Sequence, residues 1–276
     1  MAQATSKLTV SDHRRDAAGL TYVYPVLSRR SEGISIGINL NPNNACNWRC
    51  IYCQVPNLTR GPAPKIAVPQ LESELRGLLG EYLAVGTLIK DIALSGNGEP
   101  TSAREFEDVI ERIVSVMRDL KLDSRIKLVL ITNGSLIHRP KVQAGLRRMA
   151  QINGEVWFKL DRATREGIRR INDVDTSIEK VRRNLRLCAS LCPTWIQTCM
   201  FVIDGEPPDS DERKAYLDLL RESVVEGIPL RGVLLYGIAR VSHQPEAVRL
   251  SALSPEWLNQ LGSEIEAIGL PAKVSP

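Results

Sequence analysis

The sequence predicts an α/β fold in which parallel strands form a sheet with helices on its outside. Short runs of apolar and β-branched residues alternate along the chain with longer segments of helical periodicity, and this order recurs six times. Strands that alternate with crossover helices form parallel sheets. The chain has 276 residues, of which 43% are hydrophobic, which is enough for one large domain with a full core.

The strands are predicted from short, mostly apolar runs. Residues 34–39 are the first, and they run straight into a cysteine-rich loop. Residues 91–94 read as a buried strand. The same pattern predicts strands at 126–131, 155–160, 195–202 and 229–236.

The helices are predicted from apolar residues that recur on one helix face. Within 69–85 these are Leu71, Leu75, Leu78, Leu79 and Leu83, and within 102–120 they are Phe106, Val109, Ile110, Ile113 and Val114. Further helices are expected at 141–149, 177–191, 210–225 and 255–268.

Composition divides the chain into three parts. Residues 1–30 are polar and basic with an apolar patch at 22–25, and we expect an N-terminal arm packed on the domain edge. Residues 31–245 carry the alternating strands and helices of the core. Residues 246–276 are expected to form a C-terminal helical tail.

The net charge and hydropathy of the chain limit the kinds of partner that it can have. The net charge of +4 permits an anionic or nucleic-acid substrate without requiring one. No apolar run approaches the roughly 18 residues of a membrane span, so no membrane partner is expected. The first residues lack the apolar core of a secretory signal, and with six cysteines this favours a cytoplasmic protein.

Three cysteines in one short window are the strongest functional signal. Cys46, Cys50 and Cys53 have C-x3-C-x2-C spacing, so their thiolates converge on one metal centre. In a four-iron cluster this set leaves one iron without a protein ligand, and an open iron can bind a small molecule. Zinc would need a fourth ligand, whereas the three histidines, His13, His138 and His243, are scattered along the chain.

Polar residues follow several predicted strands, where the reactive groups of β/α barrels lie. Gly96, Gly98 and Glu99 follow the second strand, and the glycines allow a close backbone approach to a ligand. Asn133 follows the third strand, next to Thr132. An ordinary turn is the alternative for both segments.

The fourth strand carries a charged pair. Lys159 and Asp161 alternate with Phe158 and Leu160, so both point to one side. If the apolar residues face the helices, the charges face the interior, where they are costly unless paired or used. A purely structural ion pair is the alternative.

The last two strands add further inward-facing candidates. Gln197 on the fifth strand shares a face with Cys199. Tyr236 and Arg240 end the sixth strand, and a guanidinium suits a carboxylate or phosphate group of a substrate. For Arg240 the alternative is a solvated loop charge.

Two other groups favour plain structural interpretations. Cys188 and Cys192 lie one turn apart on a helix, and we expect them to be buried as small hydrophobes rather than to join Cys199 in an auxiliary cluster. The arginine-rich stretch 162–186 also holds acidic residues, so a solvated helix face is expected, with an RNA-facing patch as the alternative.

With Tyr52 just before its last cysteine, the motif resembles the cluster loop of the radical S-adenosylmethionine (SAM) superfamily. The resemblance implies a partial (β/α)6 barrel with parallel strands. It implies a [4Fe–4S] cluster on Cys46, Cys50 and Cys53, with SAM on the open iron. It further implies reductive cleavage of SAM to a 5′-deoxyadenosyl radical that abstracts hydrogen from a substrate, and a reductant such as flavodoxin or ferredoxin.

The same resemblance assigns cofactor contacts. Residues 96–100 stand where the family holds the SAM amino group, with Glu99 as the acidic residue, and Tyr52 stands where an aromatic residue packs near the adenine. Lys159 is then a candidate for neutralising the SAM carboxylate. The other candidates for cofactor or substrate contacts are Asn133, Asp161 and Gln197.

Within the superfamily, residues 95–101, 158–161, 171–172 and 203–208 resemble the tRNA wyosine-base (4-demethylwyosine) synthases. Those enzymes carry additional N-terminal cysteines, whereas no cysteine precedes Cys46 here. A small-molecule substrate and an RNA substrate therefore both remain as alternatives. A glycyl-radical-enzyme activase and a non-catalytic iron–sulfur protein are the remaining alternatives.

Overall fold

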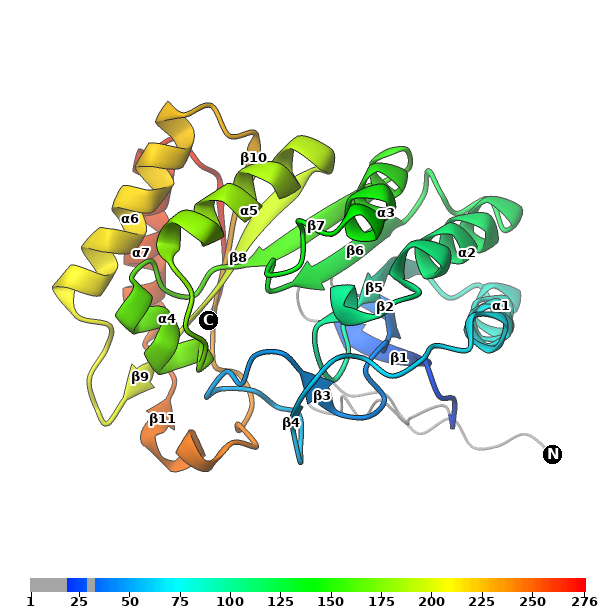
Figure 1. The fold of residues 1–276 in the computed structure, drawn as a ribbon, viewed down its shortest axis with the longest axis horizontal. Coiled ribbons are helices and arrows are strands. Elements are labelled where there is room, and N and C mark those ends of the chain that lie inside the picture. Colours follow the sequence, from blue (N-terminus) through cyan, green and yellow to red (C-terminus); the bar gives the residue numbers. More distant parts are fainter. Residues whose placement is uncertain (1–18, 29–32) are drawn as a thin grey trace.

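The computed structural model describes residues 19–28 and 33–276 and has the predicted α/β architecture. Its main sheet has the strand order β1-β2-β5-β6-β7-β8-β10-β12 (Figure 1). β1 (Val23–Ser28) is antiparallel to β2 (Gly33–Ile38), and all other neighbouring pairs are parallel. The other strands are β5 (Ile89–Leu94), β6 (Lys127–Thr132), β7 (Gly154–Lys159), β8 (Thr194–Met200), β10 (Leu230–Gly237) and β12 (Ala272–Ser275).

The six predicted strands are β2, β5, β6, β7, β8 and β10, and each is followed by a helix on the outside of the sheet (Figure 1). This is the partial (β/α)6 barrel expected from the resemblance. The covering helices are α1 (Val68–Ala84), α2 (Phe106–Asp119), α3 (Pro140–Ala150), α5 (Ile178–Leu191), α6 (Ser210–Val225) and α7 (Pro255–Ala267). No helix in the described ranges is long and apolar enough to cross a membrane.

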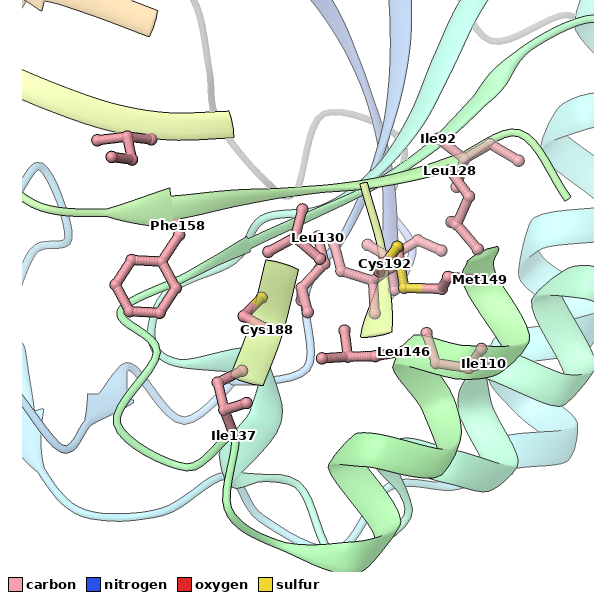
Figure 2. Close-up of a cluster of buried hydrophobic side chains, with 14 of the residues drawn as sticks. Ile92, Ile110, Leu128, Leu130, Ile137, Leu146, Met149, Phe158, Cys188 and Cys192 are labelled. Carbon is pink, nitrogen blue, oxygen red and sulfur yellow. The ribbon is translucent and has the colours of Figure 1, made fainter. Parts of the chain in front are cut away.

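The main core lies between the sheet and these helices. Figure 2 shows Leu130 and Phe158 from the strands among Leu146, Met149 and Cys188 from the helices. All of these side chains are buried. Burying one large apolar side chain stabilises a fold by about 1.5–3 kcal/mol, so this layer holds the strands in place from outside.

Both ends of the sheet hold a strand beyond those predicted. Residues 23–25 of the expected N-terminal arm belong to β1, the edge strand of the sheet, and residues 1–18 lie outside the described part. The expected helical tail contains α7 but ends in β12, which pairs with β10. β12 has only four residues, which is too few to show a strand periodicity in the sequence.

Other differences concern the strand ends. The expected helix at 102–120 starts only at Phe106, because Pro100–Ser102 form a separate 3-10 turn in which the Glu99 side chain accepts the Thr101 N–H. The expected strand 195–202 ends at Met200, and β9 (Val202–Ile203) pairs instead with β11 (Leu250–Ser251). A further helix, α4 (Arg165–Asn172), follows β7, and a 3-10 turn, η2, covers Pro245–Arg249.

The cysteine loop lies at the carboxyl ends of the strands. It follows β2 and contains the two-stranded pair β3 (Ala45–Cys46) and β4 (Thr59–Arg60). In Figure 1 this loop lies next to α4 and to the segment that holds β11. The fold therefore gathers the predicted site residues at one end of the sheet.

Candidate functional site

One cavity of about 480 Å³ joins the cysteine loop to the strand ends. Cys46, Cys50 and Cys53 all line it. The other predicted site residues on its wall are Tyr52, Gly96, Gly98, Glu99, Asn133, Lys159, Gln197, Tyr236 and Arg240. Asp161 lies just behind the wall, with its side chain 1% exposed.

The cysteine loop is fixed by hydrogen bonds from two distant segments. The N–H groups of Arg49 and Ile51 donate to the carbonyls of Asn172 and Ile171 at the end of α4. On the other side the Ser242 hydroxyl donates to the Ile51 carbonyl at 2.8 Å. Such bonds on both sides hold the three thiols in place before anything binds them.

The three thiols fit a cationic cluster. Burial raises the pKa of the Cys46 thiol to about 12 and raises that of Cys50 as well, and the nearby charge of Cys53 raises both further. Thiolates that lie together at a partly buried site need a positive centre to stay ionised. No set of three His, Cys, Asp or Glu within the described ranges is placed for a single metal ion, whereas a four-iron cluster takes each thiolate on a different iron.

Gly96 and Gly98 permit close packing between the glycine loop and the cysteine loop. A Cβ on Gly96 would lie 2.2 Å from Asn39 Oδ1, and one on Gly98 would lie 2.0 Å from the Ala45 carbonyl oxygen. Both distances are too short for any side chain. The glycines therefore allow a close backbone approach, as predicted, but the described neighbour is the cysteine loop.

Glu99 holds the ends of two strands together. Its Oε1 accepts hydrogen bonds from Thr101 N, Thr101 Oγ1 and Thr132 Oγ1 at 2.6–3.0 Å, and its Oε2 accepts from Asn133 N at 2.7 Å. Burial raises the pKa of this carboxyl, although these four bonds act to lower it. An ionised carboxylate has about four acceptor positions, so protein donors already use most of them. That Glu99 contacts a SAM ammonium stays a prediction.

We expect Glu99→Gln to lower the free energy of unfolding by about 1–3 kcal/mol, because an amide group would face a backbone or hydroxyl donor and leave it unsatisfied. Urea titration of the iron-free protein measures this. Glu81→Gln on the exposed side of α1 is the control and should change stability by less than about 0.5 kcal/mol. Equal stability of the two variants would contradict the bracing role of Glu99.

Asn133 connects the end of β6 to the cysteine loop. Its Nδ2 donates to Asn47 Oδ1 at 2.9 Å, and its Oδ1 accepts from both the N–H and the hydroxyl of Ser135. Asn47 Nδ2 in turn donates to Ser135 Oγ at 2.8 Å. Asn133 thus lines the cavity, but its side-chain amide is already hydrogen-bonded to Asn47 and Ser135.

Lys159 and Asp161 face the interior, as the alternation on β7 predicts. Lys159 Nζ lies 3.1 Å from Asp161 Oδ1 and donates to Tyr236 Oη at 2.5 Å. It also lies over the rings of Tyr52 and Tyr236, at 5.1 and 4.9 Å from their centroids. The ammonium is therefore enclosed by one carboxylate and two aromatic rings.

Asp161 forms an ion pair with Lys159 and accepts hydrogen bonds from three other residues. Besides Lys159, the donors are Tyr52 Oη at 2.5 Å, Cys199 N at 2.9 Å and Asn172 Nδ2 at 3.0 Å. Burial alone would raise the pKa of the Asp161 carboxyl, but Lys159 and these donors hold it below the ordinary value of 3.8. Asp161 is thus an ionised, buried acceptor behind the cavity wall.

Gln197 and Arg240 lie on the β8 and β10 side of the cavity. Gln197 is 1% exposed, and within the described residues its Nε2 has no hydrogen-bond partner. An unsatisfied buried donor is costly, and a bound molecule with an acceptor group would remove that cost. Arg240 Nη1 donates to Gln54 Oε1 at 3.4 Å at the edge of the cysteine loop.

The three remaining cysteines are divided between two layers. Cys188 and Cys192 are buried among apolar side chains on the helix side of the sheet (Figure 2), whereas Cys199 lines the cavity on the other side. The arginines of 162–186 are largely paired with acidic groups. Arg165 pairs with Asp175, Arg182 with Glu222 and Glu226, and the buried Arg162 with Glu212.

Sequence reasoning gave no role to Asn172, Asn47 or Ser242. Asn172 lies within a segment that carried the family resemblance, and Asn47 lies inside the cysteine motif, so both stood next to a recognised signal. Ser242 lies in an irregular segment nearly 190 residues from the cysteines that it supports. No periodicity or spacing marks such a residue.

Comparison with known proteins gives one family match. The sequence profile of the Radical SAM superfamily matches residues 40–220 of the 276. A UPF0026 protein of Helicobacter pylori J99 is 27% identical over 204 residues, which cover 72% of this chain and 61% of the relative. A UPF0026 protein of Synechocystis sp. is 28% identical over 210 residues, or 72% of this chain and 70% of the relative.

Solved structures share the fold. A radical SAM methyltransferase from Sphaerobacter thermophilus superposes with a TM-score of 0.60 at 14% identity, over 92% of this chain and 68% of that one. A spore photoproduct lyase variant with bound AdoMet gives 0.56 at 12% identity, over 83% and 73%. The H. pylori relatives are longer than the matched part, since the chain spans 61% and 50% of the two that it matches.

Proposed function

The chain belongs to the radical SAM superfamily, and from this we propose that it is an enzyme that holds a [4Fe–4S] cluster on Cys46, Cys50 and Cys53 and binds SAM beside it. When bound, the cluster and SAM supply a 5′-deoxyadenosyl radical, formed with one electron from a reductant, for abstraction of a hydrogen atom from a substrate. The observation that carries this proposal is the single cavity that the three thiols share with the strand-end residues.

The polar residues of the cavity suit SAM as a zwitterion. The last residue of β7, Lys159, presents its ammonium at the cavity wall, and its pairing with Asp161 keeps it charged despite burial. We assign it to the SAM carboxylate. The Tyr52 hydroxyl donates a hydrogen bond to Asp161, and this bond fixes the ring at the cavity wall, where we assign it to packing against the adenine.

The β8 and β10 side of the cavity is assigned to the substrate. A volume of about 480 Å³ is within the range of small-molecule sites, which supports a substrate, or the reacting part of one, of metabolite size. Gln197 offers a donor, Tyr236 a hydroxyl and Arg240 a positive charge at the rim. We therefore favour a substrate with an anionic group, which Arg240 binds.

Anaerobic reconstitution with iron and sulfide, followed by reduction in the presence of SAM, tests the enzyme assignment. We expect 5′-deoxyadenosine and methionine in equal amounts, and none from Cys46→Ala protein. Reconstituted protein with about four irons that leaves SAM intact would favour the non-catalytic iron–sulfur alternative. Separate additions of a small-molecule extract fraction and of bulk RNA then show which class stimulates SAM cleavage.

We expect Arg240→Ala to keep basal SAM cleavage but to lose the stimulation by the active fraction, because the change removes a substrate contact and no cofactor contact. The rate of 5′-deoxyadenosine formation with and without the fraction measures this. Arg231→Ala, an exposed arginine near the start of β10, is the matched control and should behave as the wild type. Full stimulation of Arg240→Ala would place the anchor elsewhere.

A further inference from the structure

Asn172 is the last residue of α4 and lies directly beside the cysteine loop. The helix ends there because Asp173 adopts a left-handed conformation with φ of 49°. The free carbonyls of Ile171 and Asn172 then accept the N–H groups of Ile51 and Arg49, which flank Cys50 in sequence. This backbone pairing places the Asn172 side chain, which is 2% exposed, against the Cys50 sulfur.

The side-chain amide of Asn172 bridges two anionic groups. Its Nδ2 lies 3.2 Å from Cys50 Sγ and 3.0 Å from Asp161 Oδ2. An amide NH2 has two protons, so it can donate one to each acceptor. The reverse orientation would point a carbonyl oxygen at a thiolate and a carboxylate, so the environment selects the donor orientation.

A hydrogen bond to a cysteine ligand affects an iron–sulfur cluster through charge. Reduction adds an electron, and part of the additional negative charge resides on the sulfurs. A donor at sulfur therefore stabilises the reduced state more than the oxidised state and raises the reduction potential. The ionised Asp161 acts in the opposite direction, and the Asn172 amide lies between that carboxylate and Cys50 Sγ.

We propose that Asn172 is a positioning residue that raises the reduction potential of the cluster through its hydrogen bond to Cys50. The inference rests on the proposed function, because it requires a cluster at Cys46, Cys50 and Cys53. It adds to that function a neutral residue outside the ligand set that makes the one-electron reduction easier. Its bond to Asp161 also connects the ligand to the Lys159 side of the cavity.

The experiment is an EPR-monitored redox titration of reconstituted wild-type protein, Asn172→Leu and Ser242→Ala, all without SAM. Leu has nearly the size of Asn and no donor. Ser242→Ala is the matched control, because it removes a hydrogen bond to the backbone of the same loop without touching a sulfur. Iron and sulfide contents are measured for each protein, so that potentials are compared at equal cluster occupancy.

We expect Asn172→Leu to lower the equilibrium constant for reduction by about three- to tenfold, where tenfold corresponds to 59 mV for one electron. Ser242→Ala should titrate like the wild type. Equal potentials for Asn172→Leu and wild type, or equal decreases in both variants, would overturn the inference and leave the proposed function intact. A wild-type protein that assembles no cluster would instead refute the proposed function.

Asn172→Ala provides the second variant if Asn172→Leu does not retain iron. It removes the same donor without adding bulk at the buried site. A lowered potential in this variant supports the inference. Loss of iron from both variants while Ser242→Ala keeps its cluster would show that Asn172 only holds the loop, and the inference would be wrong.

Discussion

Cys50→Ala is expected to leave the reconstituted protein without its four-iron centre and without SAM cleavage. With only Cys46 and Cys53 left, two irons of the cluster would lack a protein ligand. Loss of the iron–sulfur absorbance and of about four irons per chain measures the effect. Cys188→Ala is the control and should keep the four-iron centre, because this thiol is buried in the core on the helix side of the sheet, away from the cavity (Figure 2).

The opposite outcome would be equally clear. If protein with Ala at positions 46, 50 and 53 still bound four irons, the assignment of the ligands would be wrong. The remaining thiols would then have to supply the site. Since Cys188 and Cys192 lie in the core on the helix side while Cys199 lines the cavity, that result would also contradict the fold described above.

Asp161→Leu is expected to lower the free energy of unfolding by about 3–5 kcal/mol, because it leaves the Lys159 ammonium buried without a counter-charge. A loss of this size is a large fraction of the 5–15 kcal/mol typical of a domain. Urea titration of the iron-free protein measures it. The double variant Lys159→Met, Asp161→Leu removes both charges and should recover part of the loss, because Tyr52, Cys199 and Asn172 would still lack their acceptor.

The pH dependence of this effect follows from the lowered pKa of Asp161. A carboxyl whose pKa is lower in the folded state contributes stability above its unfolded pKa, near 4, and loses it as the pH falls through the folded value. The stability that the Asp161 carboxylate contributes to the wild type should therefore be fully present, and constant, from pH 6 to 8. A loss below 1 kcal/mol in that range, or a double variant less stable than Asp161→Leu, would show that the pair does not brace the site.

The strands and helices of the barrel were predictable because each has an apolar face repeated over several turns or residues. β5 and α2 are examples, with nearly every inward position buried. α4 has no such length. It has eight residues, half of them buried, and the Thr164 hydroxyl cap and the left-handed Asp173 fix its two ends. These are local features that a search for periodicity does not detect.

The site was predictable where one segment contains the signal. The cysteine spacing marks the loop, and strand alternation places Lys159 and Asp161 inside. What the sequence does not contain is the pairing between segments. Glu99 lines the cavity, and its hydrogen bonds to Thr132 and Asn133 join it to a segment more than 30 residues away in the sequence. Asn172 contacts Cys50 across 122 residues, and only the fold brings them together.

The most direct test of the central claim is magnetic-resonance detection of SAM on the cluster. Reconstituted, reduced protein is mixed with SAM labelled with 15N in the amino group and 17O in the carboxylate, and hyperfine couplings to the cluster spin are measured by ENDOR. Our account predicts couplings from both labels, because the three thiolates leave one iron open for SAM. A four-iron cluster that shows neither coupling at saturating SAM would contradict it.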